Sequence, residues 1–258
     1  MCPRCCFCCS CSCCSCCSDL HGTDVLEQVN ELSLNVEEIL YNTAPGVLYE
    51  QAPKYETGSP IVASGALAVK SGKKTGRSPS DKRVVFEEAS ADDVWWGKMN
   101  MKLDIKSFLT NRERYLNTRE RLYVVDDFGG WDEECRVSVR VITFCAYHAL
   151  FMQNMLVPPQ PHELVEFEKG GKQKPFVIFN AGVLPCNRQA EGMTSSTSIV
   201  VSFARREMVI LSTQYAGEMK KGVFTVMNYL MPLQPARSLP PAGCWLPPHA
   251  SANIGHGV

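Results

Sequence analysis

Long apolar runs, an excess of charge of one sign and internal repeats are all missing from this chain of 258 residues. No stretch approaches the roughly 20 apolar residues of a membrane span, so we expect no transmembrane helix. The formal net charge is −1, which gives no overall field to attract nucleic acid or an acidic membrane. The composition, 45% hydrophobic and 21% charged, is typical of a soluble globular protein. We therefore expect neither nucleic acid nor a membrane as a partner.

Cysteine is scarce outside the first 17 residues. Ten of the 14 cysteines fall within residues 2–17, and the other four are scattered along the chain, as in a reduced cytosolic protein. The clustered thiols could bind a soft metal ion or accept acyl groups. They lack the second, spaced half of a zinc site and the long apolar segment of a secretion signal. We favour a low-complexity leader over residues 1–20, without a fold of its own.

The rest of the chain mixes helix and strand patterns without strict alternation. Apolar residues at helical spacing predict helices over 24–41, 107–120, 146–157 and 217–231. Apolar and β-branched runs predict strands over 60–69, 83–88, 121–127, 135–144, 176–182, 197–203 and 207–213. The alternation in 135–144 predicts one polar face. This order indicates an α/β domain with a mixed sheet over residues 21–232, followed by a proline-rich segment over 233–258.

The stretch "SGKKTGRSPSDKR", residues 71–83, has the composition of a phosphate-binding loop. The Walker pattern needs Ser or Thr after Gly-Lys and a glycine five positions earlier, but Lys74 and Leu67 occupy these places. The loop therefore presents Arg77 on a Gly-Arg-Ser-Pro turn. A guanidinium can bind a carboxylate through two parallel hydrogen bonds, although for Arg77 taken alone a solvated surface residue is the favoured interpretation.

A second candidate segment is "YAGEMKKG", residues 215–222, where a strand should give way to a helix. Ligands commonly bind beyond the carboxyl ends of strands, and a helix start attracts anions. Adjacent cations disfavour each other's charge, so Lys220 or Lys221 could be neutral enough to ligate a metal. Without other evidence, the favoured interpretation is that the two lysines are the basic first turn of a surface helix. His249 lies in a small-residue loop, "PHASANIG", that suits close approach of a ligand, although a lone histidine is more often structural than metal-bound.

The remaining polar residues are weaker candidates for a functional site. We interpret His148, in an apolar helical pattern, as a core histidine with satisfied hydrogen bonds. The hydroxyls of "MTSSTS", residues 193–198, are a weak signal for a site. Asp126, Asp127 and Asp132 could be acid–base groups, but a solvated strand end is the favoured interpretation.

Together, these segments resemble one family, the ATP-dependent phosphoenolpyruvate carboxykinases. The blocks are "ASGALAVKSGKKTGRSPSDKR", "YLNTRERLYVVDDFGGWD", "RVSVRVITFCAYHALFMQNMLV", "FNAGVLPCNRQAEGMTSSTS" and "MVILSTQYAGEMKKGVFTVMNYLMP". They occur in the family's order over residues 40–232, and the similarity returns at "HASANIG". Several of these blocks are most similar in sequence to the trypanosomatid and plant branches of the family.

The resemblance implies the amino-terminal substrate domain of an enzyme of gluconeogenesis. This enzyme class converts oxaloacetate and ATP to phosphoenolpyruvate, carbon dioxide and ADP, with manganese(II) or magnesium. Arg77 and Tyr215 match the residues that line the pocket for the oxaloacetate or phosphoenolpyruvate carboxylate. Lys221 and His249 match the metal ligands, which also face the nucleotide, and Lys220 matches the lysine near the transferred phosphoryl group.

The chain also departs from the family pattern. The family's nucleotide loop, G-x-x-G-x-G-K-T-T, has no counterpart before Val258. We expect a partial carboxykinase that is inactive by itself, or alternatively a catalytically dead module that binds carboxylates. We expect a cytoplasmic location, with a glycosome-like organelle as the alternative, and a homo-oligomer is possible.

Overall fold

A computed structural model describes residues 36, 38–72, 76–98, 100–116, 121–167 and 174–233. The cysteine-rich leader, most of the helix expected over 24–41, and His249 lie outside these residues. The described part of the chain forms an eight-stranded sheet with helices on both faces, which confirms the predicted mixed α/β fold.

The sheet has the strand order β1-β4-β5-β6-β8-β7-β2-β3. Its strands are β1 (Glu38–Tyr41), β2 (Lys82–Val85), β3 (Met101–Leu103), β4 (Arg121–Gly129), β5 (Val137–Thr143), β6 (Phe176–Asn180), β7 (Ser198–Ser202) and β8 (Glu207–Leu211). β5, β6 and β8 are parallel, and the strands on either side of them run the opposite way. The ends of β5, β6 and β8 therefore share an edge with the starts of β2, β4 and β7. We call this the carboxyl edge.

The described α-helices are α2 (Pro45–Tyr55), α3 (Ile105–Leu116), α4 (Ala146–Met155) and α5 (Gly217–Leu233), and short 3₁₀ turns span Pro79–Asp81, Glu88–Ser90 and Pro161–Phe167. α4 and α5 pack on one face of the sheet, α3 on the other, and α2 against α4. None of the helices in the described ranges is both long and apolar enough to cross a bilayer.

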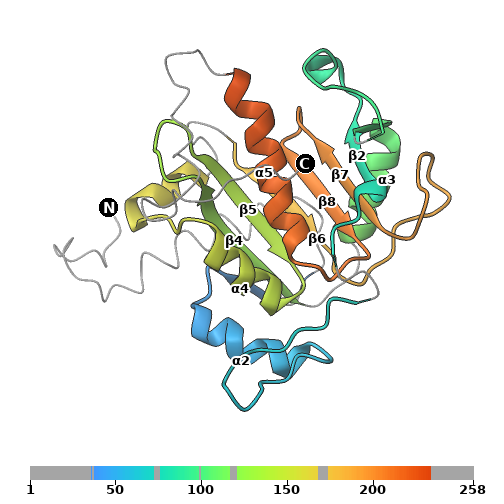
Figure 1. Ribbon diagram of the computed structural model, residues 1–258. Helices are drawn as coiled ribbons and strands as arrows, with labels where there is room; N and C mark the ends of the chain where they lie inside the picture. Colours follow the sequence, from blue (N-terminus) through green and yellow to red (C-terminus); the bar gives the residue numbers. More distant parts are fainter. Residues whose placement is uncertain are drawn as a thin grey trace.

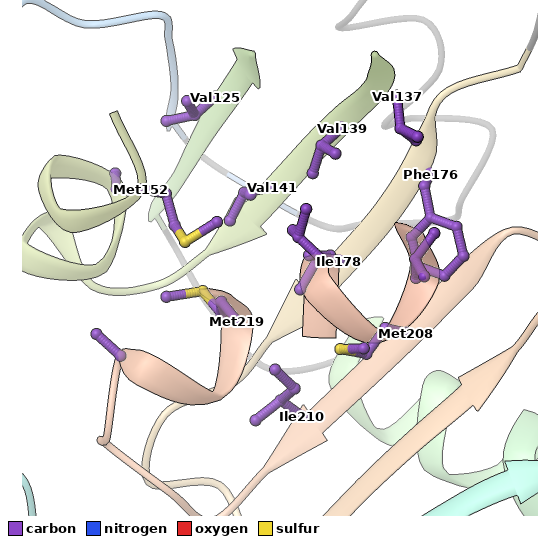
Figure 2. Close-up of a cluster of buried hydrophobic side chains, with 14 of the residues drawn as sticks. Val125, Val137, Val139, Val141, Met152, Phe176, Ile178, Met208, Ile210 and Met219 are labelled. Atoms are coloured by element: carbon purple, nitrogen blue, oxygen red, sulfur yellow. The ribbon is translucent and has the colours of Figure 1, made fainter. Parts of the chain in front are cut away.

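Side chains alternate between two cores along each central strand, as the pleat of a strand requires. In β4, Val125 faces the core beneath α4 and α5, whereas Val124 faces the core beneath α3. Figure 2 shows the first core, where Met152 of α4 and Met219 of α5 meet the valines of β5. Both faces of the central sheet are thus buried, which fixes the register of the strands that reach the carboxyl edge.

Two predictions of secondary structure are wrong. Residues 38–41 form β1 rather than the end of a helix, because β4 supplies a parallel partner. Residues 60–69 form no strand: the chain reverses at Gly65, whose φ is +81°, and the only pairing there is an isolated bridge between Ile61 and Leu67. β5 does carry Ser138 and Arg140 on the face opposite its valines, as the alternation predicts, but all seven of its residues are buried.

Gly222 lets α5 cross β8 closely. A Cβ at this position would lie 2.4 Å from Cε of Met208. The buried tip of Met208 must turn aside for the new methyl group, at an overpacking cost of about 1–3 kcal/mol, while alanine favours helix by about 1 kcal/mol over glycine. We therefore expect Gly222→Ala to lower the free energy of unfolding by about 1 kcal/mol. Urea denaturation would measure the change, with Asn228→Ala at an exposed position of α5 as the control. An alanine variant more stable than the parent would contradict close packing at this crossing.

Candidate carboxylate-binding site

The carboxyl edge brings the loop before β2 next to the start of α5. β2 begins at Lys82, and β8 ends at Leu211 on the same edge. Glu218, in the first turn of α5, joins the two segments. Its Oε1 accepts a hydrogen bond from Ser78 N at 2.7 Å, and its Oε2 lies 3.1 Å from Lys82 Nζ. The Glu218 side chain is fully buried, so this contact is an internal connection between the segments that carry Arg77 and Tyr215.

The same loop is anchored on its other side by residues 192–195. Ser195 Oγ donates to Asp81 Oδ1 at 2.7 Å. Arg83 donates to the carbonyl oxygen of Gly192 and to Thr194 Oγ1, each at 3.1 Å. The hydroxyl-rich segment therefore supports the loop from within the protein. Arg77 itself is exposed, so its guanidinium is open to a ligand from solvent.

Tyr215 lies between β8 and α5, as the sequence predicts. Its N–H donates to Thr213 Oγ1 at 3.2 Å, and its carbonyl oxygen accepts from Glu218 N at 3.1 Å. A Cβ on Gly217 would lie 2.6 Å from Cε1 of the Tyr215 ring. The ring therefore packs directly on the Gly217 backbone, and any larger residue there would displace it.

Lys220 and Lys221 occupy the first turn of α5. Lys220 is exposed, and Lys221 is half-buried with its Nζ 5.2 Å from the centroid of the Phe224 ring. Across the ranges that the structure describes, no three His, Cys, Asp or Glu side chains form a group able to hold a metal ion. Of the two predicted ligands only Lys221 is described, and one nitrogen does not make a divalent-metal site. The metal ligation expected of Lys221 and His249 therefore stays a prediction.

His148 is a buried core histidine, as predicted. It is 1% exposed, with Nε2 3.0 Å from the Gln214 carbonyl oxygen and Nδ1 3.4 Å from Thr143 Oγ1. Burial lowers its pKa, so the ring is neutral near pH 7. Because a carbonyl only accepts, Nε2–H donates to Gln214, and Nδ1 accepts from the Thr143 hydroxyl. His148 thereby fixes the residue that immediately precedes Tyr215.

Comparison with known proteins decides the family. A sequence model of the family described as phosphoenolpyruvate carboxykinase matches residues 37–257. The chain belongs to this family. Phosphoenolpyruvate carboxykinase (ATP) of Dictyostelium discoideum is 52% identical over 219 residues, which cover 84% of this chain and 37% of that protein.

Two further relatives agree. Phosphoenolpyruvate carboxykinase (ATP) 1 of Arabidopsis thaliana is 52% identical over 232 residues, 88% of this chain and 33% of its own length. Phosphoenolpyruvate carboxykinase (ATP) 2 of Salinibacter ruber is 49% identical over 230 residues, 88% of this chain and 41% of its own length. The carboxykinase chain described here thus spans between 33% and 41% of the length of these relatives.

A cavity of about 580 Å³ opens at the carboxyl edge of this carboxykinase chain, beside His148 and Gln214. Most of the charges that line it already have partners. Arg121 pairs with Glu38 at 2.6 Å, and Glu56 accepts a hydrogen bond from Tyr147 N at 2.9 Å at the start of α4. Burial raises the pKa of Glu56.

The aspartates of β4 are not a solvated strand end. Asp126 is fully buried, and its carboxylate accepts hydrogen bonds from Arg140 at 2.7 and 2.6 Å. Asp127 is 3% exposed, and burial, with a smaller effect of the neighbouring Asp126, raises its pKa to about 8. Only Asp132 is partly exposed, and it accepts from Glu134 N in a turn. Asp126 and Asp127 lie in the second half of β4, away from the carboxyl edge that carries Arg77.

Sequence reasoning missed the contact by which Glu218 joins the two segments of the candidate site. An acidic residue in the first turn of a helix is ordinary, since it interacts favourably with the helix dipole. The pattern Tyr-Ala-Gly-Glu placed Glu218 next to Tyr215, but nothing in the sequence identifies its partner, the amide of Ser78, 140 residues away.

Proposed function

We propose that this chain provides the carboxylate-binding part of an ATP-dependent phosphoenolpyruvate carboxykinase. Such an enzyme converts oxaloacetate and ATP to phosphoenolpyruvate, carbon dioxide and ADP. The observation that carries the proposal is the direct link from Glu218 to Ser78 N, which brings the Arg77 loop to the segment of Tyr215 and the two lysines. Family membership and identities of 49% to 52% with three ATP-dependent relatives support the assignment.

Arg77 and Tyr215 are proposed to bind the substrate carboxylate. An exposed guanidinium offers parallel N–H donors that match the two carboxylate oxygens. The Tyr215 ring, packed on Gly217, presents a rigid wall beside the first turn of α5. The start of a helix adds a favourable field for an anion. The carboxylate would therefore be fixed from two segments that Glu218 holds together.

Lys220 and Lys221 are proposed to act on the phosphate side of the reaction. The exposed ammonium of Lys220 would neutralise charge on the transferred phosphoryl group. Lys221 and His249 would face the nucleotide and ligate manganese(II) or magnesium, and Lys221 would have to be unprotonated to do so. The metal would stabilise negative charge on the enolate and phosphate oxygens.

Calorimetric titration of the purified chain with phosphoenolpyruvate tests the carboxylate site. We expect weak binding that falls at least about tenfold in Arg77→Ala, since a charge-assisted hydrogen bond contributes about 1.5–3 kcal/mol. Arg77→Lys should recover only part of the affinity, because lysine keeps the charge without the fork. The control is Lys106→Ala, an exposed cation that follows β3 at the opposite edge of the sheet. Equal affinity of the parent and Arg77→Ala would remove Arg77 from the site.

A parallel assay separates the enzyme from a binding module. Oxaloacetate, ATP and manganese(II) are supplied, and formation of phosphoenolpyruvate is followed. Binding through Arg77 without turnover would support the module for this chain by itself.

We also propose a cytoplasmic location, supported by the scattered cysteines after residue 17, and a homo-oligomer that sedimentation would detect.

A further inference from the structure

We propose that Glu218 is a positioning residue that sets the place of Arg77 relative to Tyr215 without touching the substrate. This inference rests on the proposed function of Arg77 in carboxylate binding. The Glu218 side chain is fully buried, so it cannot meet a ligand that enters from solvent. It acts through the backbone of its neighbour in space, Ser78.

The hydrogen bond from Ser78 N fixes the peptide group that joins residues 77 and 78. A peptide group is planar, and its plane contains the Cα atoms of both residues. A carboxylate oxygen that holds Ser78 N at 2.7 Å therefore also fixes the Cα of Arg77. A bond of this length to an ionised acceptor belongs to the strong class. Rotation about the Arg77 Cα–C bond and the side-chain torsions are then the freedom left to its guanidinium.

On its carboxyl side Arg77 is restrained by the turn that follows it. Pro79 starts a 3₁₀ turn that ends at Asp81, with Asp81 N donating to Ser78 O at 3.0 Å. Gly76 precedes Arg77, and no described residue lies within 4 Å of a Cβ added there. The Glu218 carboxylate is thus the element that relates Arg77 to α5.

Glu218 is equally fixed toward Tyr215. Its own N–H donates to the Tyr215 carbonyl oxygen at 3.1 Å. The Lys82 side chain, which is 27% exposed, places its Nζ 3.1 Å from Glu218 Oε2 and partly balances the buried negative charge. One residue therefore contacts the backbone on both sides of the proposed carboxylate site, and the separation of Arg77 and Tyr215 depends on it.

The test is a double-mutant cycle with calorimetric titration of phosphoenolpyruvate. Glu218→Gln keeps the side-chain shape but replaces the charged acceptor and places an amide against Lys82. We expect affinity to fall about tenfold, as for the loss of one charge-assisted hydrogen bond. In an Arg77→Ala background the same change should have almost no further effect, because contributions that act through one residue are not additive.

Glu88→Gln, at an exposed position beyond the end of β2, is the matched control. Lys82→Met provides a second variant that removes the ion pair and leaves the Ser78 bond, and it should weaken binding less than Glu218→Gln. Urea denaturation of each variant establishes that it is folded at the titration temperature. Parent-like affinity of Glu218→Gln, or a full additional loss in the Arg77→Ala background, would overturn the positioning role. A parent chain that does not bind phosphoenolpyruvate would instead overturn the proposed function, and the inference with it.

Discussion

Replacing Asp127 with asparagine should abolish a loss of stability that the parent chain undergoes between about pH 4 and pH 8. The side chain lies on the face of β4 that packs under α4 and α5, between Val125 and Gly129. Among the described residues, its Oδ2 has no hydrogen-bond partner. Burial therefore disfavours the ionised form and raises the pKa to about 8 from 3.8.

The sign of the effect follows from proton binding. Between the two pKa values the folded state keeps the proton on Asp127, while the unfolded state releases it. The contribution of Asp127 to stability is therefore highest below about pH 4, falls as pH rises, and levels off above about pH 8. Each pKa unit corresponds to about 1.4 kcal/mol, so the total is on the order of 5 kcal/mol.

Urea denaturation of the parent and of Asp127→Asn across this pH range measures the difference. The two free energies of unfolding should converge near pH 4 and separate steadily as pH rises, with the asparagine variant more stable at pH 8. Asp92→Asn, at an exposed position, serves as the control and should follow the parent. Parallel curves for the parent and Asp127→Asn would show that the buried carboxyl is ionised in the folded state.

Removing Asp126 should destabilise the fold by about 3–5 kcal/mol, because it leaves the charge of Arg140 buried without its carboxylate. Arg140 is 4% exposed and donates two hydrogen bonds to Asp126 and a third to the Phe167 carbonyl oxygen at 3.1 Å. Tyr41 also donates to Asp126, at 2.9 Å, which ties the edge strand β1 to this pair.

The double variant Asp126→Leu/Arg140→Met tests the cause. Replacing both partners of a buried pair with apolar groups is often close to neutral, so the double variant should be more stable than Asp126→Ala. The exposed pair Arg121–Glu38 is the internal comparison, and Glu38→Gln should cost no more than about 1 kcal/mol. A double variant as unstable as Asp126→Ala would mean that packing, not the unpaired charge, dominates.

The sequence alone predicts a helix or strand correctly where its apolar residues form a long, regular run. The strand predicted over 121–127 is β4, Arg121–Gly129, and the helix predicted over 217–231 is α5, Gly217–Leu233. Shorter elements were not predictable. α2 buries only Leu48 and Ala52 and contains Pro53, so it has little apolar periodicity. The three residues of β3 become a strand through pairing with β2.

In the candidate site, too, some residues could be predicted from the sequence and others could not. The motifs around Arg77 and Tyr215 were recognised, because each is contiguous in sequence. The prediction that the aspartates of β4 are solvated was wrong, because Arg140 of the neighbouring strand β5 pairs with the buried carboxylate of Asp126. Glu218 was missed because its role depends on Ser78, which only the sheet topology brings near. Local pattern predicts where such residues lie along the chain, but pairing across the sheet decides what they contact.

The placement of β2 beside β7 has a consequence for the order of folding during synthesis. Glu87, just after β2, accepts a hydrogen bond from Ser202 of β7, which lies 115 residues later in the chain. Ser78 donates to Glu218, which lies 140 residues later. A ribosome adds about 5–20 residues per second, so β2 leaves the exit tunnel several seconds before its partner. Contacts this distant slow folding, because the loop must close before they can form. We therefore expect the Arg77 loop to be among the last parts of the domain to become ordered on a nascent chain, and β2 to need protection from mispairing until β7 arrives.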